Sequence, residues 1–251
     1  MSLEISIVIP VYNEEANIQP LVAEVTQVFK GREYEIILVD DCSTDGSWAQ
    51  LQQLRSENPR LRALRHSLRC GQSTAIWNGV KAARAAVVAT LDGDGQNDPA
   101  DLPALLQALQ EANTGANAGV NDGADRRVAM VAGWRTHRKD SAVKLLSSRI
   151  ANGIRRSLLR DGTPDTGCGI KVFYRDVFIG LPYFDHMHRF LPALVQRTGR
   201  TVISAPVKHR PRLRGKSKYG IWNRLWVGIV DLLGVAWLMR RSQRPSVEEL
   251  T

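Results

Sequence analysis

Apolar and polar positions alternate along the first half of the chain in blocks that predict strands followed by helices. Residues 5–9 are apolar and mostly β-branched, as expected of a strand buried on both faces of a parallel sheet. Apolar residues then recur at helical spacing from Ile18 to Phe29, which predicts a helix that ends near Lys30. Further strands are predicted at 35–39, 61–65 and 86–91, and further helices at about 47–57 and 72–84. This alternation indicates an α/β fold with a doubly wound, mostly parallel sheet.

The second half continues the pattern less regularly. Helices are predicted at 99–111, 141–159 and 190–197, and strands at 128–131, 170–174 and 202–207. Surface loops are expected at 113–125 and 165–169. The 251 residues suit one main domain, expected at 1–210, followed by a basic loop and helix at 211–241 and a tail at 242–251.

Residues 219–239 form a strongly apolar segment that contains several tryptophans. Its length approaches the roughly 20 residues of a spanning helix. Arg224 and Asp231 would be costly at the centre of a bilayer, however. Tryptophans and basic flanks favour an amphipathic helix that lies in the membrane interface. The alternative is a C-terminal helix that packs on the core of the domain.

The chain is basic, with a net charge of +9 and a dense run of Lys and Arg from Lys208 to Lys218. Such a run favours an anionic partner: nucleic acid, a phosphorylated substrate or an anionic membrane surface. No helix-turn-helix, zinc-finger or RNA-binding strand motif is present, so nucleic acid is not expected. The position of the run before the apolar segment favours the membrane surface over an ordinary solvated face.

The cysteines and the N-terminus indicate a cytoplasmic location, at the cytoplasmic face of the membrane. Cys42, Cys70 and Cys168 are odd in number and lack CxxC spacing, which argues against disulfides and a zinc site. The first apolar run is too short for a signal peptide and lacks a basic start.

Candidate chemistry gathers where the predicted strands end. Asp92 and Asp94 follow the fourth strand, and two carboxylates at this spacing can bind Mg²⁺ or Mn²⁺ while leaving room for a diphosphate. Gly93 permits a close backbone approach, and Gln96 adds a neutral oxygen. An acidic turn without a ligand is the alternative.

Residues after the first two strands add a second set of candidates. Tyr12 could stack on a nucleotide base, and Glu14 could accept hydrogen bonds from the base or the ribose. Asp41 ends the second strand beside them. Ligands of such sheets sit beyond the carboxyl ends of the strands. Together these residues predict a nucleotide-sugar site.

Several segments resemble the signature of glycosyltransferase family 2, and most of all its polyprenol-phosphate (dolichol-phosphate) mannosyltransferase group. They are Pro10 to Glu14, Val39 to Gly46, Asp92 to Gln96, Gly133 to Arg135, Asp165 to Gly169 and Arg212 to Gly220. The resemblance implies the Rossmann-like GT-A fold and inverting, metal-dependent transfer of mannose or another hexose. The sequence departs from the usual pattern at Gly95, Asn97 and Cys168-Gly169.

The resemblance also implies a role for each matching residue. The nucleoside would be held by Pro10, Tyr12, Glu14, Val39 and Asp41. The sugar nucleotide would lie against Asp92 and Gly93, and the metal would be bound by Asp92, Asp94 and Gln96. The diphosphate or the acceptor phosphate would be bound by Arg135, Arg212 and Lys218. Asp165 would orient sugar hydroxyls or arginines, which makes the expected catalytic set Asp92, Asp94, Arg135 and Asp165.

The expected substrates are therefore a nucleotide-diphosphate sugar and a polyprenyl phosphate. A lipid phosphate is already anionic and needs no general base, unlike a hydroxyl acceptor. Arg189 or His188 is a further candidate for contact with the acceptor phosphate, although a lone histidine is more often structural.

Three alternatives remain at this stage. One is a family 2 enzyme that acts on a glycan or another hydroxyl, although the segment Gln196 to Arg200 lacks the Trp of the QxxRW motif typical of processive synthases. Another is a membrane-bound nucleotide-binding module without turnover. A Rossmann dehydrogenase is disfavoured because no GxGxxG follows the first strand.

Overall fold

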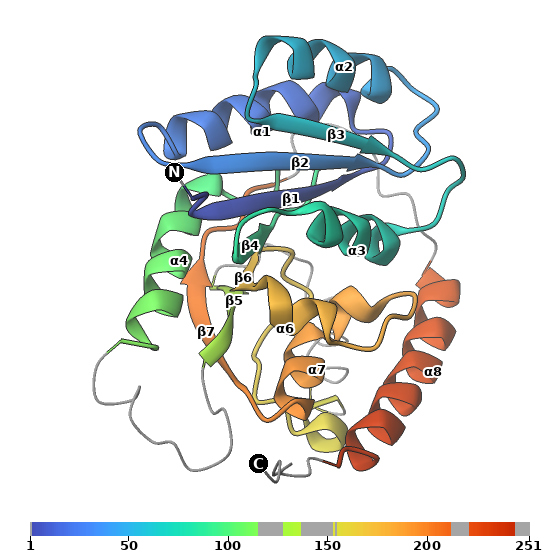
Figure 1. Ribbon diagram of the computed structural model, residues 1–251. Coiled ribbons are helices and arrows are strands. Elements are labelled where there is room, and N and C mark those ends of the chain that lie inside the picture. Colours follow the sequence, from blue (N-terminus) through green and yellow to red (C-terminus); the bar gives the residue numbers. More distant parts are fainter. Residues whose placement is uncertain (1, 115–127, 137–152, 154, 212–220, 244–251) are drawn as a thin grey trace, which may run out of the picture.

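Helices cover both faces of one seven-stranded sheet, which gives a three-layer α/β domain (Figure 1). The computed structural model describes residues 2–114, 128–136, 153, 155–211 and 221–243, and the side chains of 221–226 are not described. The strands are β1 (Ile5–Val11), β2 (Tyr34–Asp40), β3 (Leu61–Arg65), β4 (Val87–Thr90), β5 (Val128–Arg135), β6 (Lys171–Tyr174) and β7 (Thr201–Val207). Their order in the sheet is β3-β2-β1-β4-β6-β5-β7.

The predicted mostly parallel sheet is confirmed, with one strand reversed. Strand β6 runs antiparallel to both of its neighbours, β4 and β5, whereas the other pairs are parallel. The described helices are α1 (Glu15–Val28), α2 (Ser47–Glu57), α3 (Gln72–Ala82), α4 (Leu102–Glu111), α6 (Arg175–Ile179), α7 (Leu191–Arg197) and α8 (Ile221–Arg240), with short 3₁₀ turns η1 (Pro99–Asp101) and η3 (Met187–Arg189).

The core is divided by the sheet into two apolar layers. Ile7 of β1 faces the layer that contains residues of α1, α2 and α4, and its neighbour Val8 faces the layer that contains residues of α3, α7 and α8. Successive side chains of a strand point to opposite faces, so a strand covered on both sides must be apolar throughout. This requirement explains the continuous apolar runs of β1 and β2.

The strand boundaries agree with the sequence patterns except at β5. The pattern predicts its end at Val131, but the strand continues to Arg135 because Gly133, Trp134 and Arg135 all pair with β7. Pairing with a neighbour, rather than the apolar run, decides where this strand ends. Of the helix predicted at 141–159, the structure describes only residue 153 and residues 155–159, which are helical. Most of the loop expected at 113–125 lies outside the described residues.

The predicted C-terminal helix is present as α8 and lies beside α7 (Figure 1). Val235 and Ala236 are buried in the core, whereas Val230, Leu233 and Trp237 are 65%, 59% and 59% exposed. None of the described helices has both the length and the apolar character that crossing a bilayer requires. Association of α8 with a membrane surface stays a prediction.

Candidate active site

The carboxyl ends of β1, β2 and β4 meet at one edge of the sheet, where the predicted acidic residues lie. Because β1 pairs with both other strands, Asp41 and Asp92 follow strands on either side of it. Gly93 rests on the end of β1, and a Cβ there would lie 2.7 Å from the carbonyl oxygen of Pro10. Only glycine permits this approach, which brings the loop after β4 against β1.

Hydrogen bonds hold the three predicted metal ligands in one tight loop. The amide of Asp92 donates to Asn97 Oδ1 at 3.0 Å, and the amide of Gln96 donates to Asp94 Oδ1 at 3.1 Å. From the start of α3, Gln72 Nε2 donates to Asp92 Oδ1 at 2.9 Å. Asp92, Asp94 and Gln96 therefore lie together, as predicted.

The electrostatics of this loop suit a cation. Burial and then the Asp94 carboxylate raise the pKa of Asp92 to about 6, while Lys171 and Arg135 act in the opposite direction. The raised pKa means that burial and the neighbouring Asp94 carboxylate make a negative charge on Asp92 unfavourable. A divalent cation offsets that charge, and Mg²⁺ and Mn²⁺ prefer oxygen ligands such as these. The donor set of Asp92, Asp94 and Gln96 therefore fits such an ion.

A pocket of about 440 Å³ opens beside Asp92, and two further predicted residues line it. At the end of β5, Arg135 donates Nε to Asp165 Oδ2 at 2.6 Å and an Nη to Asp165 Oδ1 at 2.9 Å. The two side chains are 16% and 8% exposed. A bidentate pair of this kind is rigid, so it fixes the pocket wall opposite the metal loop.

Lys171, at the start of β6, is a pocket residue that sequence reasoning missed. It is 4% exposed, and its Nζ donates to the carbonyl oxygens of Cys168 and Thr166. Burial lowers the pKa of this ammonium group, whereas the nearby Cys168 and Asp92 raise it. Its only sequence signal is a lysine inside an apolar strand pattern. Such a lysine is rarely buried without a partner, which could have drawn attention to it.

The unusual Cys168-Gly169 pair lies where the pocket wall meets the metal loop. A Cβ at Gly169 would overlap the Asp92 carboxylate, so glycine is needed there. Cys168 is 1% exposed, and burial raises the pKa of its thiol. The thiol is therefore a neutral packing group rather than a reactive one.

The residues predicted to hold a nucleoside do not line this pocket. Pro10 and Val39 lie near the ends of β1 and β2, and Tyr12, Glu14 and Asp41 follow these strands. The ring of Tyr12 lies beneath the Arg69 guanidinium, whose carbon is 4.2 Å from the ring centroid. Asp41 accepts hydrogen bonds from the amides of Cys70 at 2.7 Å and Gly71 at 2.8 Å. These bonds anchor the loop that leads into α3.

Two other predicted nucleoside contacts have different surroundings. Glu14 precedes α1, and its Oε2 accepts a hydrogen bond from Asn17 at 2.7 Å. Val39 is fully buried within β2, so its side chain packs in the core and only its backbone could contact a ligand. The sequence motif alone did not show that Glu14 could contact a ligand through its side chain and Val39 only through its backbone.

Arg212 and Lys218 lie outside the described residues, but the chain that leads to them runs beside the metal loop. The amide of Arg210 donates to the carbonyl oxygen of Gln96 at 2.9 Å. The Arg210 guanidinium pairs with Asp98 and Glu24, each at 2.7 Å. The basic run therefore begins beside the loop that carries Asp92, Asp94 and Gln96.

The structure separates the two residues considered for contact with the acceptor phosphate. His188 also lines the pocket, its Nδ1 lies 2.7 Å from Ser73 Oγ, and burial holds its pKa well below the usual value. It therefore carries no charge at neutral pH. Arg189 lines the pocket together with Asp92, Arg135 and Asp165.

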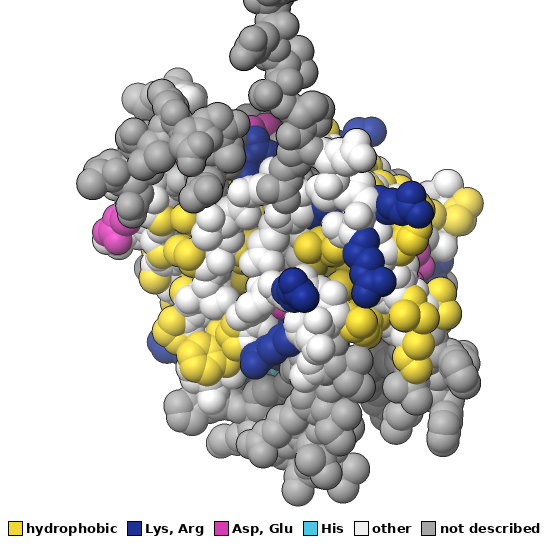
Figure 2. All heavy atoms as spheres, turned by 90° about the horizontal axis from the view of Figure 1, so that it is seen from below, with side chains coloured by type: hydrophobic (Ala, Val, Ile, Leu, Met, Phe, Trp, Pro, Cys, Tyr) yellow, Lys and Arg dark blue, Asp and Glu magenta, His cyan; other side chains and the backbone are white. Residues whose placement is uncertain are grey.

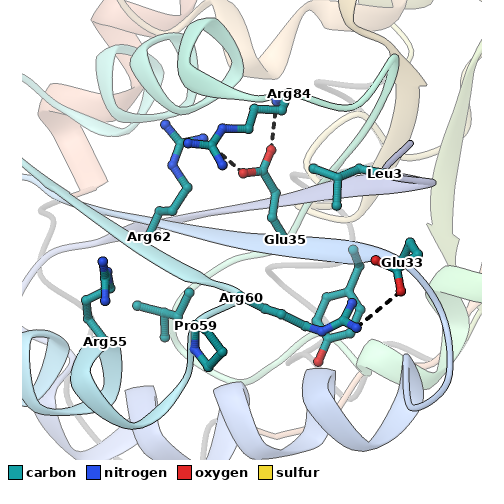
Figure 3. A pocket seen from close by; sticks show the side chains of 10 residues that line it. Leu3, Glu33, Glu35, Arg55, Pro59, Arg60, Arg62 and Arg84 are labelled. Atoms are coloured by element: carbon teal, nitrogen blue, oxygen red, sulfur yellow. Dashed lines mark hydrogen bonds and ion pairs between the residues drawn. The ribbon is translucent and has the colours of Figure 1, made fainter. Parts of the chain in front are cut away.

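A second hollow, of about 400 Å³, lies at the opposite edge of the sheet, where β2 and β3 begin (Figure 3). Glu35 is 4% exposed there and accepts hydrogen bonds from Arg62 at 2.9 Å and from the amide of Arg84 at 2.7 Å. Ser6 Oγ donates to the same carboxylate at 2.7 Å. This network ties β1, β2 and β3 together and contains none of the predicted site residues.

Comparisons with known proteins point to one family. Residues 6–181 match the family model described as glycosyl transferase family 2. The chain is 34% identical over 250 residues to a dodecaprenyl-phosphate galacturonate synthase of Rhizobium johnstonii, covering 97% of this chain and 70% of that protein. It is 32% identical over 221 residues to an undecaprenyl-phosphate 4-deoxy-4-formamido-L-arabinose transferase of Edwardsiella ictaluri, covering 86% of this chain and 63% of that protein.

Solved structures share the fold at lower identity. A glucosyl-3-phosphoglycerate synthase of Mycobacterium tuberculosis, in complex with Mn²⁺, UDP and glucosyl-3-phosphoglycerate, has a TM-score of 0.60 and 17% identity, with 96% of this chain and 81% of that chain covered. A mannosyltransferase of Pyrobaculum calidifontis, in complex with GDP-Man and Mn²⁺, has a TM-score of 0.62 and 18% identity, with 98% and 66% covered.

Proposed function

Because the chain belongs to glycosyltransferase family 2, we propose that it transfers a sugar, mannose or another hexose, from a nucleotide-diphosphate sugar to a polyprenyl or dolichyl phosphate with inversion. One observation carries the proposal. Asp92 and the cationic groups of Arg135 and Arg189 line a single pocket, and Asp94 lies close enough to Asp92 to raise its pKa. The carboxylates suit a metal-bound diphosphate, and the cations suit a second phosphate. The names of the two curated relatives, both polyprenyl-phosphate sugar transferases, support this acceptor.

The donor would lie across the carboxyl ends of β1, β2 and β4. Tyr12, Glu14 and Asp41 would contact the nucleoside, together with the backbone of Pro10 and Val39. Gly93 would allow the sugar nucleotide to approach the chain, and Arg135 with Arg212 and Lys218 would contact its phosphates. A Mg²⁺ or Mn²⁺ ion held by Asp92, Asp94 and Gln96 would supply charge that stabilises the leaving diphosphate.

The remaining chemistry belongs to side chains of the chain itself. Arg135 would bind phosphate oxygens while Asp165 fixes its orientation through the bidentate pair. Arg189 would draw the acceptor phosphate into line with the anomeric carbon. Lys171 would keep the loop that carries Cys168 in place through its carbonyl contacts.

A phosphate acceptor also agrees with the lack of a poised general base among the described pocket residues. Asp165 is engaged by Arg135, and His188 is buried against Ser73. Asp92 is one of the three proposed metal ligands and accepts a hydrogen bond from Gln72. A hydroxyl acceptor would need one of these groups to take its proton, whereas a lipid phosphate attacks as an anion. Transfer to a glycan hydroxyl is therefore the second candidate.

Helix α8 supports a location at the cytoplasmic face of a membrane. Its exposed Val230, Leu233 and Trp237 form an apolar ridge, and Arg240 and Arg241 lie at its end. On the underside of the molecule, towards which α8 ends in Figure 1, hydrophobic side chains lie beside Lys and Arg side chains (Figure 2). A ridge of this kind suits the interface of an anionic bilayer.

The test is transfer from a panel of donors to polyprenyl phosphate in vesicles with Mn²⁺ or Mg²⁺. The donors are GDP-mannose, UDP-glucose and the nucleotide sugars of galacturonate and 4-formamido-arabinose. We expect one donor to give a labelled lipid product that is stable to alkaline phosphatase. Transfer from no donor refutes the proposal, and transfer only to a glycan hydroxyl favours the second candidate. Asp94→Asn should abolish transfer without unfolding the protein.

A further inference from the structure

The one acidic side chain described on α8 faces the protein. The Asp231 side chain is 17% exposed, whereas the adjacent Val230 is 65% exposed. In the sequence, Asp231 only argued against a spanning helix. A buried carboxylate on an otherwise apolar helix is costly unless it has a partner, so its surroundings indicate what it does.

The partner of Asp231 is a histidine in the segment before η3. His186 Nδ1 lies 3.2 Å from Asp231 Oδ2, and this contact is not aligned as a hydrogen bond. His186 adopts a left-handed backbone conformation, with φ of 64°, which is uncommon for a residue with a side chain. Its amide donates to Asp185 Oδ1 at 2.8 Å. The contact with Asp231 and this hydrogen bond stabilise an otherwise unfavourable turn.

The same segment reaches the pocket and α3. The carbonyl oxygen of His186 accepts a hydrogen bond from the amide of Arg189 at 3.1 Å, so the turn sets the path of the chain into Arg189. Tyr183 Oη lies 2.8 Å from Thr74 Oγ1, and His188 Nδ1 lies 2.7 Å from Ser73 Oγ. Residues 183–189 thus bridge α8 and the start of α3, where Gln72 contacts Asp92.

We propose that Asp231 is a positioning residue, which holds residues 183–189 through His186 and thereby sets the place of Arg189 in the pocket. The inference rests on the proposed function in one respect: Arg189 meets the acceptor phosphate. Burial raises the pKa of Asp231, the nearby His186 and Arg189 lower it, and Asp185 raises it, so the carboxylate lies close to both His186 and Arg189. Displacement of α8 would therefore displace Arg189.

The coupling matters because α8 also carries the exposed apolar ridge. When the exposed apolar ridge binds a lipid surface, the opposite face of the same helix is held against the protein, with Asp231 in contact with His186. Arg189 would then be in place when the lipid phosphate arrives. In solution, where α8 is held by its packing on the core through residues such as Val235, Ala236 and Leu238, the same position would be held less firmly.

The test compares Asp231→Ala, Asp231→Asn, His186→Gln and the double variant Asp231→Ala/His186→Gln. Glu57→Gln, at the exposed end of α2, is the charge-matched control. A short, water-soluble isoprenyl phosphate serves as acceptor, so that membrane binding does not enter. We expect Asp231→Ala to raise the KM for the acceptor about tenfold and to change the donor KM less than about twofold. Asp231→Asn should be milder, and the double variant no worse than Asp231→Ala.

Amide hydrogen exchange gives a readout that needs no activity. Exchange at residues 183–189 should rise in Asp231→Ala and His186→Gln but not in Glu57→Gln. Unchanged exchange, or equal rises in both KM values, overturns the inference. If the wild-type protein transfers no sugar, the proposed function fails, whereas the exchange data still decide whether Asp231 holds this segment.

Discussion

Asp92 is expected to be a residue whose charge destabilises the metal-free protein. Its pKa is raised from 3.8 to about 6, so the folded state keeps the proton to a higher pH than the unfolded chain does. The stability contributed by the protonated acid is fully present below pH 3.8 and is lost as pH rises to about 6. The shift corresponds to about 3 kcal/mol.

Asp92→Asn should remove this cost, because the amide is neutral at every pH and its oxygen can still accept from Gln72 Nε2. The calculated gain in unfolding free energy is about 0.5 kcal/mol at pH 4 and about 3 kcal/mol at pH 8. Asp92 is only half-buried, and water in the pocket screens the charge. We therefore expect a gain of about 1–3 kcal/mol at pH 8.

Urea denaturation in EDTA at pH 4, 5, 6 and 8 measures this gain, and Glu111→Gln on the exposed end of α4 is the control. Saturating Mn²⁺ should then favour the wild-type protein over the variant, because the ion at 100 times its Kd stabilises the wild-type protein by about 2.7 kcal/mol. The variant should gain far less and should lack activity. An Asn variant that is less stable than the wild-type protein at pH 8, or a gain that does not grow with pH, would refute the reasoning.

Three further predictions concern the pocket and the opposite edge of the sheet. Arg135→Gln leaves the Asp165 carboxylate without its bidentate partner and should lower unfolding free energy by about 3 kcal/mol, whereas Arg135→Lys should lose less; urea denaturation measures both. Gly169→Ala should push the Asp92 carboxylate aside and cut kcat/KM about tenfold or more in the transfer assay, with a smaller effect on stability. Glu35→Gln should destabilise the protein by about 1–3 kcal/mol at pH 7. Burial raises the pKa of Glu35, but its hydrogen bonds outweigh burial and lower it. The difference in stability between the wild-type protein and this variant should therefore shrink as the pH falls below 4.5. Thermal melts at a series of pH values measure this difference, and a difference that does not change with pH would contradict the prediction.

The sequence was most informative where one local rule determines the outcome. Apolar runs bounded by polar residues predicted the strands of the first half, because a strand covered on both faces is apolar at most positions, and its few buried polar residues, such as Ser6 and Glu35, are hydrogen-bonded. Asp92, Asp94 and Gln96 could be grouped because they share one loop after a strand. Asp41 directly follows the neighbouring strand β2, so the same reasoning placed it at this edge of the sheet.

Features that depend on distant parts of the chain could not be predicted in this way. The reversed direction of β6 leaves no trace in its apolar pattern, so the role of Lys171 at its start was missed. The contact between His186 and Asp231 joins two elements far apart in the chain. Val39 shows a related limit, since a motif match does not tell a backbone contact from a buried side chain.

The reversed strand β6 also has a consequence for how the protein folds. The pairs of β2 with β1 and with β3 join segments that are near in sequence, whereas β4 pairs with β1 and with β6 across much longer stretches of chain. Contacts of large sequence separation form slowly. Strands β1, β2 and β3 should therefore assemble early, and a nascent chain should gain a complete sugar-binding wall only after β4 and β6 have left the ribosome and joined the sheet. Nucleotide-sugar affinity would then be among the last properties to appear during refolding.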